Sequence, residues 1–427
     1  MAGNRWLSTL SSRFGSHFPA ETIAERTLGR EAEHPVVHPD GSAAEISPLW
    51  PLLAEIPDLK PKVENGVVMG LNGPDFSYAA EGGIATIEVI TRPCTDLHGI
   101  QGIYEDAMGH LVEAADSVGL RVLGYGIQPK TPRSPQMLTD RQRYRVLLDR
   151  LGPPWLWFSV TASEQLHYAA NRSEAVRLNN LANLLAPVVI ALCGHSPIHS
   201  GIAGEACCSR ELGMGLIDPG HNRHGMTGKP AENLDTYVRE MAELPYFFER
   251  IDGIPHARQD TFVQWLDAHG DDDPEFVWAA FLLHDHYNWN SARLRSAHGT
   301  VELRAACQQP PDEHMAASAL SMGICEAANA LGDWLDGELG DRAWPMMTAW
   351  HPRVVELGLA AEDPFPGLLE GVLSRCANAL EARGRAEEIF LEPLFGRLED
   401  RENPAQRARD VFLAGGMPAL IDYAAWS

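Results

Sequence analysis

Acidic and basic side chains alternate on one short segment late in the chain. In Thr300-Val301-Glu302-Leu303-Arg304, the β-branched and apolar residues predict a β-strand, on which Glu302 and Arg304 are two positions apart. Side chains at positions i and i+2 of a strand point to the same face of its sheet. The segment therefore predicts a carboxylate and a guanidinium side by side on one sheet surface.

Three further segments place polar side chains on predicted strands. The first has Glu31 and Glu33 on one face, the second has Gln165 and His167 on one face, and the third carries Glu81 and Glu88 at its two ends. A single Glu on a strand is most simply a solvent-facing residue, so the indication comes from their joint occurrence. Sheet faces that helices cover are normally apolar. Mg²⁺ binds through carboxylates and substrate phosphates, so these segments predict a site for hard cations and phosphate.

The overall charge limits the class of partner. A formal net charge of −24 argues against nucleic acid, whose phosphates require clustered Lys and Arg. An enzyme of this charge that acts on ATP needs metal ions and a local set of arginines. Four arginines could neutralise a phosphoryl group in transfer, namely Arg210, Arg293, Arg295 and Arg304.

Composition predicts a globular protein of the reducing cytoplasm. The 427 residues allow one large domain or a few smaller ones, and the 45% hydrophobic content is enough for a full core. No signal peptide and no run of eighteen apolar residues is apparent, so no membrane partner is expected. The seven cysteines include no C-x-x-C pair, which disfavours a zinc ribbon.

The order of predicted elements indicates α+β rather than a doubly wound sheet. Neither G-x-G-x-x-G after a strand nor G-x-x-x-x-G-K-[ST] is present. Strands are expected within 29–95 and at 121–127, 157–169 and 299–306. Helices are expected at 99–118, 137–151, 171–193 with a kink at Pro187, 231–243, 259–268 and 274–284, and a long loop at 194–228. From Asp312 onward the chain is expected to be almost purely helical.

Taken in order, these segments resemble the glutamate–cysteine ligases, carboxylate–amine ligases whose catalytic fold is related to glutamine synthetase. The resemblance is nearest to the bacterial and plant-type branch and covers roughly residues 28–310. The Gln308-Gln309-Pro310 ending is similar to the actinobacterial branch linked to ergothioneine biosynthesis. The matching segments are the G-x-E-x-E strand at 29–33, the acidic segment at 81–93, the histidine strand at 165–168, a helix ending in A-L-x-x-x-S-P by 197, Ser209-Arg210, Arg293-Leu294-Arg295 and Glu302-Leu303-Arg304.

The resemblance implies a curved, mainly antiparallel sheet that forms an active-site funnel, flanked by helices. It implies one catalytic domain over 1–427, with a lead-in at 1–28, a sheet-based core at 29–310 and a mostly helical portion at 311–427. It also implies ATP and Mg²⁺ as cofactors, small amino acids as substrates and a cytoplasmic location, with a homodimer as one candidate assembly. The implied metal ligands are Glu31, Glu33, Glu81, Glu88, His167 and Glu302.

The implied reaction has two steps. ATP phosphorylates the γ-carboxylate of glutamate, and an amine, by default cysteine, then displaces phosphate to give a γ-glutamyl amide, ADP and phosphate. Glu302, Arg304 and Arg210 are expected to act in catalysis. Residues expected to contact the nucleotide are Arg293, Arg295, Arg304 and Gln165.

Two positions depart from the family pattern. Cys307 stands where relatives carry Asp, and a thiol cannot replace a carboxylate as a hard-metal ligand. Arg30 separates the two acids of the first strand, where an apolar or acidic residue is more usual. Both departures bear on the identity of the carboxylate and the amine more than on the ligase chemistry.

Three alternative functions remain open besides the glutamate–amine ligase. The same chemistry could join a different carboxylate or amine in natural-product biosynthesis. The sheet could instead serve a guanidino-kinase-like phosphotransferase, or the chain could be a non-catalytic homologue, although all six implied ligand residues are intact. His284-Asp285-His286 is predicted to mark a helix end, His221 and His224 to lie in the long loop, and Cys207 and Cys208 to be packing residues.

Overall fold

A nine-stranded sheet forms the centre of the protein, whose structure is a computed structural model that describes residues 2–269 and 272–427. All of the strand pairings in this sheet are antiparallel, so the predicted α+β class with a mainly antiparallel sheet is confirmed. The order is β14 (Ala292–Arg295), β15 (Thr300–Cys307), β7 (Ser163–Ala169), β1 (Leu28–Val37), β5 (Thr86–Thr91), β4 (Phe76–Ala80), β3 (Val67–Asn72) and β2 (Lys60–Glu64), with β6 (Arg121–Val122) beside the end of β1.

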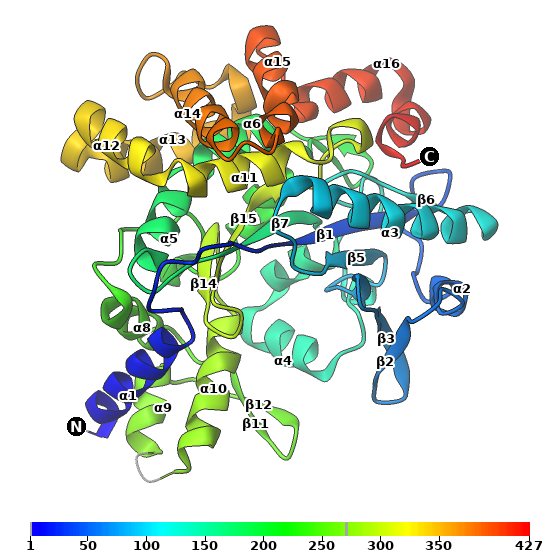
Figure 1. The fold of residues 1–427 in the computed structure, drawn as a ribbon. Coiled ribbons are helices and arrows are strands. Elements are labelled where there is room, and N and C mark those ends of the chain that lie inside the picture. The colour runs from blue at the N-terminus through cyan, green and yellow to red at the C-terminus, as the bar shows by residue number, and fades with distance from the viewer. Residues whose placement is uncertain (1, 270–271) are drawn as a thin grey trace.

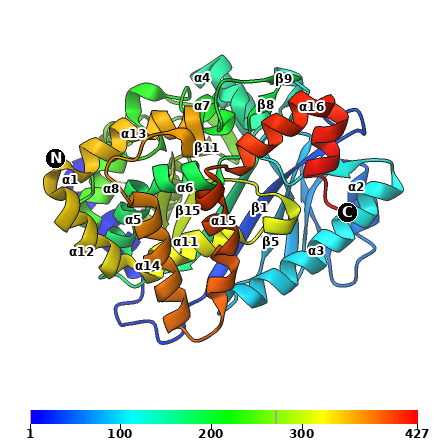
Figure 2. The ribbon, with the colours of Figure 1, turned by 90° about the horizontal axis from the view of Figure 1, so that it is seen from above.

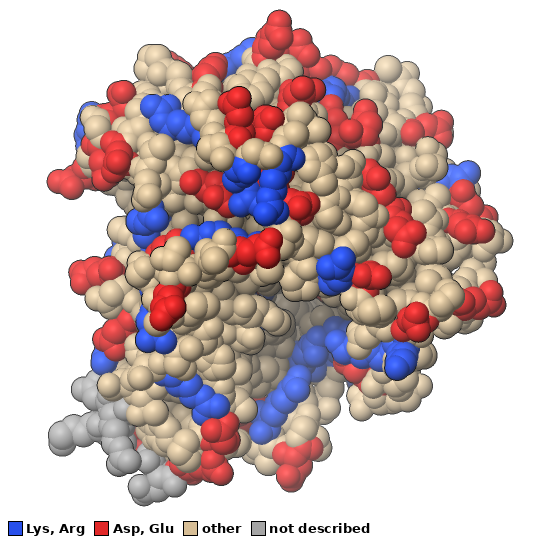
Figure 3. Space-filling view, in the orientation of Figure 1, with Lys and Arg blue, Asp and Glu red and all other residues tan. Residues whose placement is uncertain are grey.

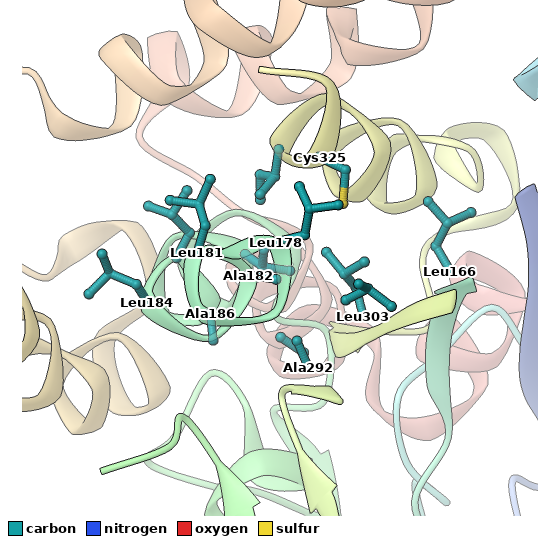
Figure 4. Packing of buried hydrophobic residues seen from close by; sticks show 14 of the residues in the cluster. Leu166, Leu178, Leu181, Ala182, Leu184, Ala186, Ala292, Leu303 and Cys325 are labelled. Atoms are coloured by element: carbon teal, nitrogen blue, oxygen red, sulfur yellow. The ribbon is translucent and has the colours of Figure 1, made fainter. Parts of the chain in front are cut away.

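One face of this sheet is apolar because alternate residues of the central strands are apolar. Ala32 of β1, Leu166 of β7 and Leu303 of β15 are buried on it. The helices that pack on this face are α3 (Leu97–Ser117), α5 (Ala175–Leu184), α6 (Ala186–Cys193) and α11 (Ala316–Glu326). Figure 4 shows leucines and alanines of α5 and α6 gathered with Leu166, Leu303 and Cys325 of α11 into one apolar cluster.

The C-terminal helices form a further layer outside α6 and α11 (Figures 1 and 2). They show the helical character that was predicted from Asp312 onward, which begins with two consecutive helices, α11 and α12. The layer comprises α12 (Ala328–Leu339), α13 (Ala343–Leu357), α14 (Leu368–Ala382), α15 (Glu392–Asp400) and α16 (Pro404–Ala424).

Shorter elements stand on the opposite side of the sheet, below it in Figure 1. The N-terminal helix packs against two of the helices there, α8 and α9. The elements are α1 (Ala2–Ser16), α4 (Gln142–Leu151), α8 (Leu234–Ala242), α9 (Phe262–Ala268), α10 (Pro274–His286) and the β11 (Phe248–Ile251)–β12 (Ile254–Ala257) hairpin, while α2 (Leu49–Leu53) lies beside β3.

Several predicted boundaries are wrong. The helix expected at 171–193 begins only at Ala175 and is two helices, α5 and α6. The bend predicted at Pro187 is present and measures 49°, and Pro187 itself lies in the first turn of α6, where its missing N–H costs nothing. Of the strand expected at 121–127, only β6 is a regular strand, with isolated bridges at Leu123 and Ile127. The strand expected at 157–169 begins at Ser163 after a 3₁₀ turn. The helix expected from 137 begins at Gln142.

The segment expected to be a long loop, 194–228, contains short regular elements. They are β8 (Ile198–His199), β9 (Ile202–Ala203), α7 (Ser209–Met214) and β10 (His224–Gly225), which pairs in parallel with β13 (Trp289–Asn290). Within the described residues, no single helix is long and apolar enough to cross a membrane, and only the bent pair α5–α6 passes such a test by length and composition.

Candidate active site

The polar residues predicted from four separate segments share one face of the sheet. Glu33 of β1 lies opposite Glu88 of β5, and Glu31 lies opposite Gln165 of β7. His167 lies opposite Glu302 of β15, and Glu302 lies opposite Arg293 of β14. Directly paired residues of antiparallel strands point the same way, so the register carries these side chains across five adjacent strands.

Glu302 is the centre of the charged network. Its carboxylate accepts two hydrogen bonds from Arg293, at 2.8 and 2.9 Å, and a further one from Arg304. Arg295 Nε lies 3.3 Å from Glu302 Oε2. Burial acts to raise the pKa of Glu302, but the charges of Arg293 and Arg304 hold it well below its usual range. Glu302 is therefore an ionised carboxylate inside the protein.

Glu31, His167 and Glu302 offer three ligand atoms within 4.8 Å of one another. His167 Nε2 lies 3.2 Å from Glu31 Oε1 and has no hydrogen-bond partner of acceptable geometry, although it is buried. His167 Nδ1 lies 3.0 Å from the Thr300 hydroxyl, which fixes the ring so that Nε2 faces the two acids. An orphaned imidazole nitrogen between two carboxylates fits a bound divalent cation.

A second acidic group lies further along the same face, toward β4 and β5. Burial, reinforced by the charge of Glu33, raises the pKa of Glu81 to about 7. Burial also raises the pKa of Glu88 well above its usual range, and Glu81 adds to this effect. Burial likewise raises the pKa of Glu33. A cation would remove the repulsion between these acids. Among the described residues, however, only Glu31, His167 and Glu302 bring three ligand atoms within 4.8 Å of one another, so the expected ligand roles of Glu33, Glu81 and Glu88 stay predictions.

Gln165 and Arg304 connect the two acidic groups. The Gln165 amide oxygen accepts a hydrogen bond from Arg304, and its nitrogen donates to Glu33 Oε1 at 3.2 Å. The backbone N–H of Ser163 donates to Glu33 Oε2 at 2.6 Å. Gln165 thus positions the surrounding side chains, and its expected contact with nucleotide stays a prediction.

The four predicted arginines have different surroundings. Arg293 has four of its five N–H donors engaged, because it donates twice to Glu302 and also to the carbonyl oxygens of His286 and Asn288 at 2.9 and 2.6 Å. Its geometry favours holding Glu302 in place over contacting nucleotide. Arg210, on α7, is buried and donates to the carbonyl oxygens of Arg304 and Ala305 at 3.1 and 3.5 Å, which places it beside the site.

Cys307 is fully buried at the end of β15 among small groups. Its sulfur lies 3.4 Å from Cys208 Sγ and 3.5 Å from Ser196 Oγ. Burial acts to raise the pKa of the Cys307 thiol, but the hydrogen bond from Cys208 and the charge of Arg210 bring it down to about 7. The position is thus a compact thiol environment beside Arg210.

Arg30, the other departure, points away from the site. It lies on the opposite face of β1, where Arg30 Nε is 2.6 Å from Glu164 Oε1 and the guanidinium stacks 3.6 Å from the centre of the Tyr104 ring. Glu164 also accepts a 2.6 Å hydrogen bond from Ser318 of α11. Arg30 therefore joins the sheet to its covering helices.

Some residues of the site escaped sequence reasoning. Thr300, which orients His167, lies two positions before Glu302, so the i, i+2 rule could have identified it. His286 and Asn288, whose carbonyl oxygens hold Arg293, give no sequence signal because backbone atoms make the contacts. His284-Asp285-His286 does mark the end of a helix, since α10 ends at His286.

The sequence profile of glutamate–cysteine ligase family 2 matches residues 60–417 of this chain. A provisionally named glutamate–cysteine ligase 2-3 of Rubrobacter xylanophilus is 24% identical over 425 residues, covering 97% of this chain and 99% of that protein. The glutamate–cysteine ligase of Halobacterium salinarum is 27% identical over 199 residues, covering 46% of this chain and 44% of that protein.

Among solved structures, a bifunctional glutathione synthetase from Pasteurella multocida superposes with a TM-score of 0.51 at 14% identity. The match covers 98% of this chain and 52% of that one, so the chain spans about half the length of this relative and shares its fold. The glutamate–cysteine ligase from Francisella tularensis in complex with AMP superposes with a TM-score of 0.48 at 12% identity, covering 95% and 89% of the two chains.

Proposed function

The chain belongs to glutamate–cysteine ligase family 2 and is a ligase, and we propose that it uses ATP to couple the γ-carboxylate of glutamate to an amine. One observation carries this proposal. The acids of β1 and β5, His167 of β7 and the Glu302–arginine network of β14 and β15 lie on a single sheet face. The proposed cation ligands and phosphate-binding groups are thereby adjacent, which supports ATP chemistry at this face.

The residues suit activation of a carboxylate as an acyl phosphate. An ionised carboxylate does not condense with an amine in water, so its oxygen must first become a good leaving group. Arg304 and Arg210 would stabilise the charge of the phosphoryl group as it moves. Bound Mg²⁺, held by Glu31, Glu33, Glu81, Glu88, His167 and Glu302, would offset charge on the β- and γ-phosphate oxygens.

The amine acceptor is proposed to be cysteine by default. The same chemistry with a different amine or carboxylate is the second candidate, and Cys307 is the observation that favours it. Cys307, in contact with Cys208, stands at the position for which the family resemblance implies an Asp. A substrate group that needs this carboxylate would lose its partner in this chain.

Release of inorganic phosphate from ATP tests the proposal directly. The purified protein with Mg²⁺ is assayed against a panel of carboxylates and amines, singly and in pairs. A ligase releases phosphate only when donor and acceptor are both present. A phosphotransferase would give ADP and a phosphorylated product without free phosphate, and a non-catalytic homologue would give neither; either result would reject the proposal.

A further inference from the structure

The His284-Asp285-His286 sequence at the end of α10 has one member that is open to solvent. His284 is buried, donates a 2.8 Å hydrogen bond to the carbonyl oxygen of Met241 and stacks on Phe262 with ring centres 4.8 Å apart. Asp285 is buried as well. His286 is exposed. The core therefore accounts for the first two residues and leaves the third without a packing role.

The backbone of His286 is fixed beside the charged network of the site. Its carbonyl oxygen accepts a 2.9 Å hydrogen bond from Arg293, and the same guanidinium donates two hydrogen bonds to Glu302. The imidazole ring meets the Tyr287 ring edge-on, with centres 5.0 Å apart. Among the described residues, neither nitrogen of the His286 ring has a hydrogen-bond partner. The ring is thus held at a defined place with both nitrogens available to a ligand.

The charges that act on this ring are those of the candidate active site. They belong to Arg293 and Arg295 of β14, Arg143 of α4 and Glu302 of β15. Arg143 also lines a cavity of about 830 Å³. Figure 3 shows a hollow on this side of the molecule, crossed by a strip of basic side chains. His286 therefore stands between the cavity wall and the Glu302 network, and not on an outer helix end.

These surroundings keep the His286 ring neutral. Enclosure by the protein lowers its pKa well below the usual range, and the positive charges of the three arginines lower the pKa further, against the opposing charge of Glu302. A neutral imidazole carries a lone pair on one nitrogen, whereas a guanidinium has only N–H groups to offer. The ring is consequently a proton acceptor among donors.

Coupling a carboxylate to an amine requires a proton acceptor of this kind. An amine is mostly an ammonium ion at neutral pH, and an ammonium nitrogen has no lone pair with which to attack. The acids on the sheet face are proposed to hold cations, which takes up their lone pairs. Arg304 and Arg210 are proposed to stabilise the phosphoryl group, and they cannot accept a proton.

We propose that His286 is the general base of the reaction and takes the first proton from the amine. The inference rests on the proposed function, because it assigns a role in that reaction. The ammonium passes one proton to the ring nitrogen, and the neutral amine attacks the carbonyl carbon of the acyl phosphate. The C–N bond forms and the C–O bond to phosphate breaks, with its electron pair and the second amine proton leaving on phosphate. The exposed ring then returns its own proton to water.

The order of the two chemical steps follows from the charges around the ring. An imidazolium ion is disfavoured beside three guanidiniums. The anionic acyl phosphate offsets these guanidiniums once it has formed. His286 is therefore a poor base in the free protein and a better one after the first step, when the proton has to move.

The test compares two nucleophiles that differ in protonation. Phosphate release is measured with ATP, Mg²⁺ and glutamate at about pH 7, where the amine of cysteine is protonated and hydroxylamine is already neutral. In His286→Gln, we expect kcat with cysteine to fall about 100-fold or more, and kcat with hydroxylamine to stay within about threefold of the unaltered protein. His256→Gln changes an exposed histidine of β12 and should alter neither value.

Every other result decides against the proposal. Equal losses with cysteine and hydroxylamine would show that His286 supports the site without accepting a proton. Unchanged rates with both would show that the amine loses its proton elsewhere, while the proposed function stands. If the unaltered protein releases phosphate with neither nucleophile, the proposed function fails and the role of His286 fails with it. Retained hydroxylamine turnover also shows that the variant is folded.

Discussion

Glu302 is held by three guanidiniums at a position that is only 1% exposed, so its substitution affects the site and the fold together. Glu302→Gln removes the charge and leaves Arg293, Arg295 and Arg304 without a counter-ion. We expect loss of turnover and a decrease in unfolding free energy of about 3–5 kcal/mol, the usual cost of breaking a buried ion pair. Chemical denaturation and the phosphate-release assay measure the two effects.

Glu31→Gln is the matched control. The Glu31 side chain is 30% exposed, and within the described residues His167 is the one basic group paired with it within 4 Å. It should lose turnover to a similar degree with an unfolding free energy within about 1 kcal/mol of the unaltered protein. Retained turnover in either variant would contradict the metal-ligand assignment.

The raised pKa of Glu81 predicts a pH-dependent effect of Mg²⁺. Folding raises this pKa from 4.5 to about 7, so without metal the unfolding free energy falls as pH rises through that interval. Mg²⁺ binds the ionised acids and reverses this loss. In thermal unfolding, Mg²⁺ should therefore raise Tm more at about pH 8 than at about pH 6. Equal shifts at both pH values, or an undiminished shift in Glu88→Gln, would contradict the assignment.

The face of the sheet to which each strand residue points could be predicted from the sequence, whereas contacts between residues of different strands could not. Alternation places Glu31 with Glu33 on one face, and it equally places Arg30 and Glu164 on the other. That Arg30 finds Glu164 depends on the register of β1 and β7, which are far apart in the chain. The roles of the site residues remain predictions until the experiments above are done.

At the scale of elements, helix α7 positions Arg210, and it packs closely against its neighbour. A Cβ added at Gly213 would lie 2.2 Å from the Trp157 ring. Gly213→Ala should therefore displace α7, lower the unfolding free energy by about 1–3 kcal/mol and reduce kcat through Arg210. Denaturation and steady-state kinetics give both numbers.

Gly102→Ala is the control for this substitution. Gly102 lies inside α3, and a Cβ there meets nothing within 4 Å. Since glycine is a poor helix former, Gly102→Ala should raise the unfolding free energy by up to about 1 kcal/mol and leave kcat unchanged. If Gly213→Ala and Gly102→Ala lowered the unfolding free energy equally, the close contact between α7 and Trp157 would not be the cause of the loss.

Whether a segment is a helix or a strand was easier to predict than the residues at which it begins and ends. The apolar spacing of 99–118 predicted α3 within two residues at each end. By contrast, the apolar periodicity across 171–193 does not show where one helix ends and the next begins, and only Pro187 indicated the bend that separates α5 from α6. The 194–228 segment lacks periodicity because its elements are too short to show one, as α7 with six residues illustrates.

At the scale of the whole molecule, a buried ion pair joins the sheet to the helical layer. Arg30 contacts Glu164, the carbonyl oxygen of His314 and, through Glu164, Ser318 of α11. Arg30→Met alone should lower the unfolding free energy by about 3–5 kcal/mol, because it leaves the buried Glu164 carboxylate without a counter-ion. Arg30→Met/Glu164→Leu should recover most of this loss, since paired apolar replacements remove both buried charges.

Chemical denaturation of the two single variants and the double variant completes this cycle. Losses that simply add would mean that the two residues act independently, contrary to their 2.6 Å contact. Three expectations about the whole molecule stay predictions: the division of the chain at residues 28 and 310, the homodimer and the cytoplasmic location.

The strand order also determines when the protein can first work during its synthesis. Strand β1 leaves the ribosome early, but its neighbour β7 follows only at residues 163–169 and β15 only at 300–307. Until β7 is made, the acidic strand β1 has one open edge, and from then until β15 is made the open edge is that of β7, to which other chains can attach. A chain that ends before β15 lacks Glu302 and Arg304 and leaves one edge of β7 unpaired, so we expect it to have no ligase activity and to aggregate readily.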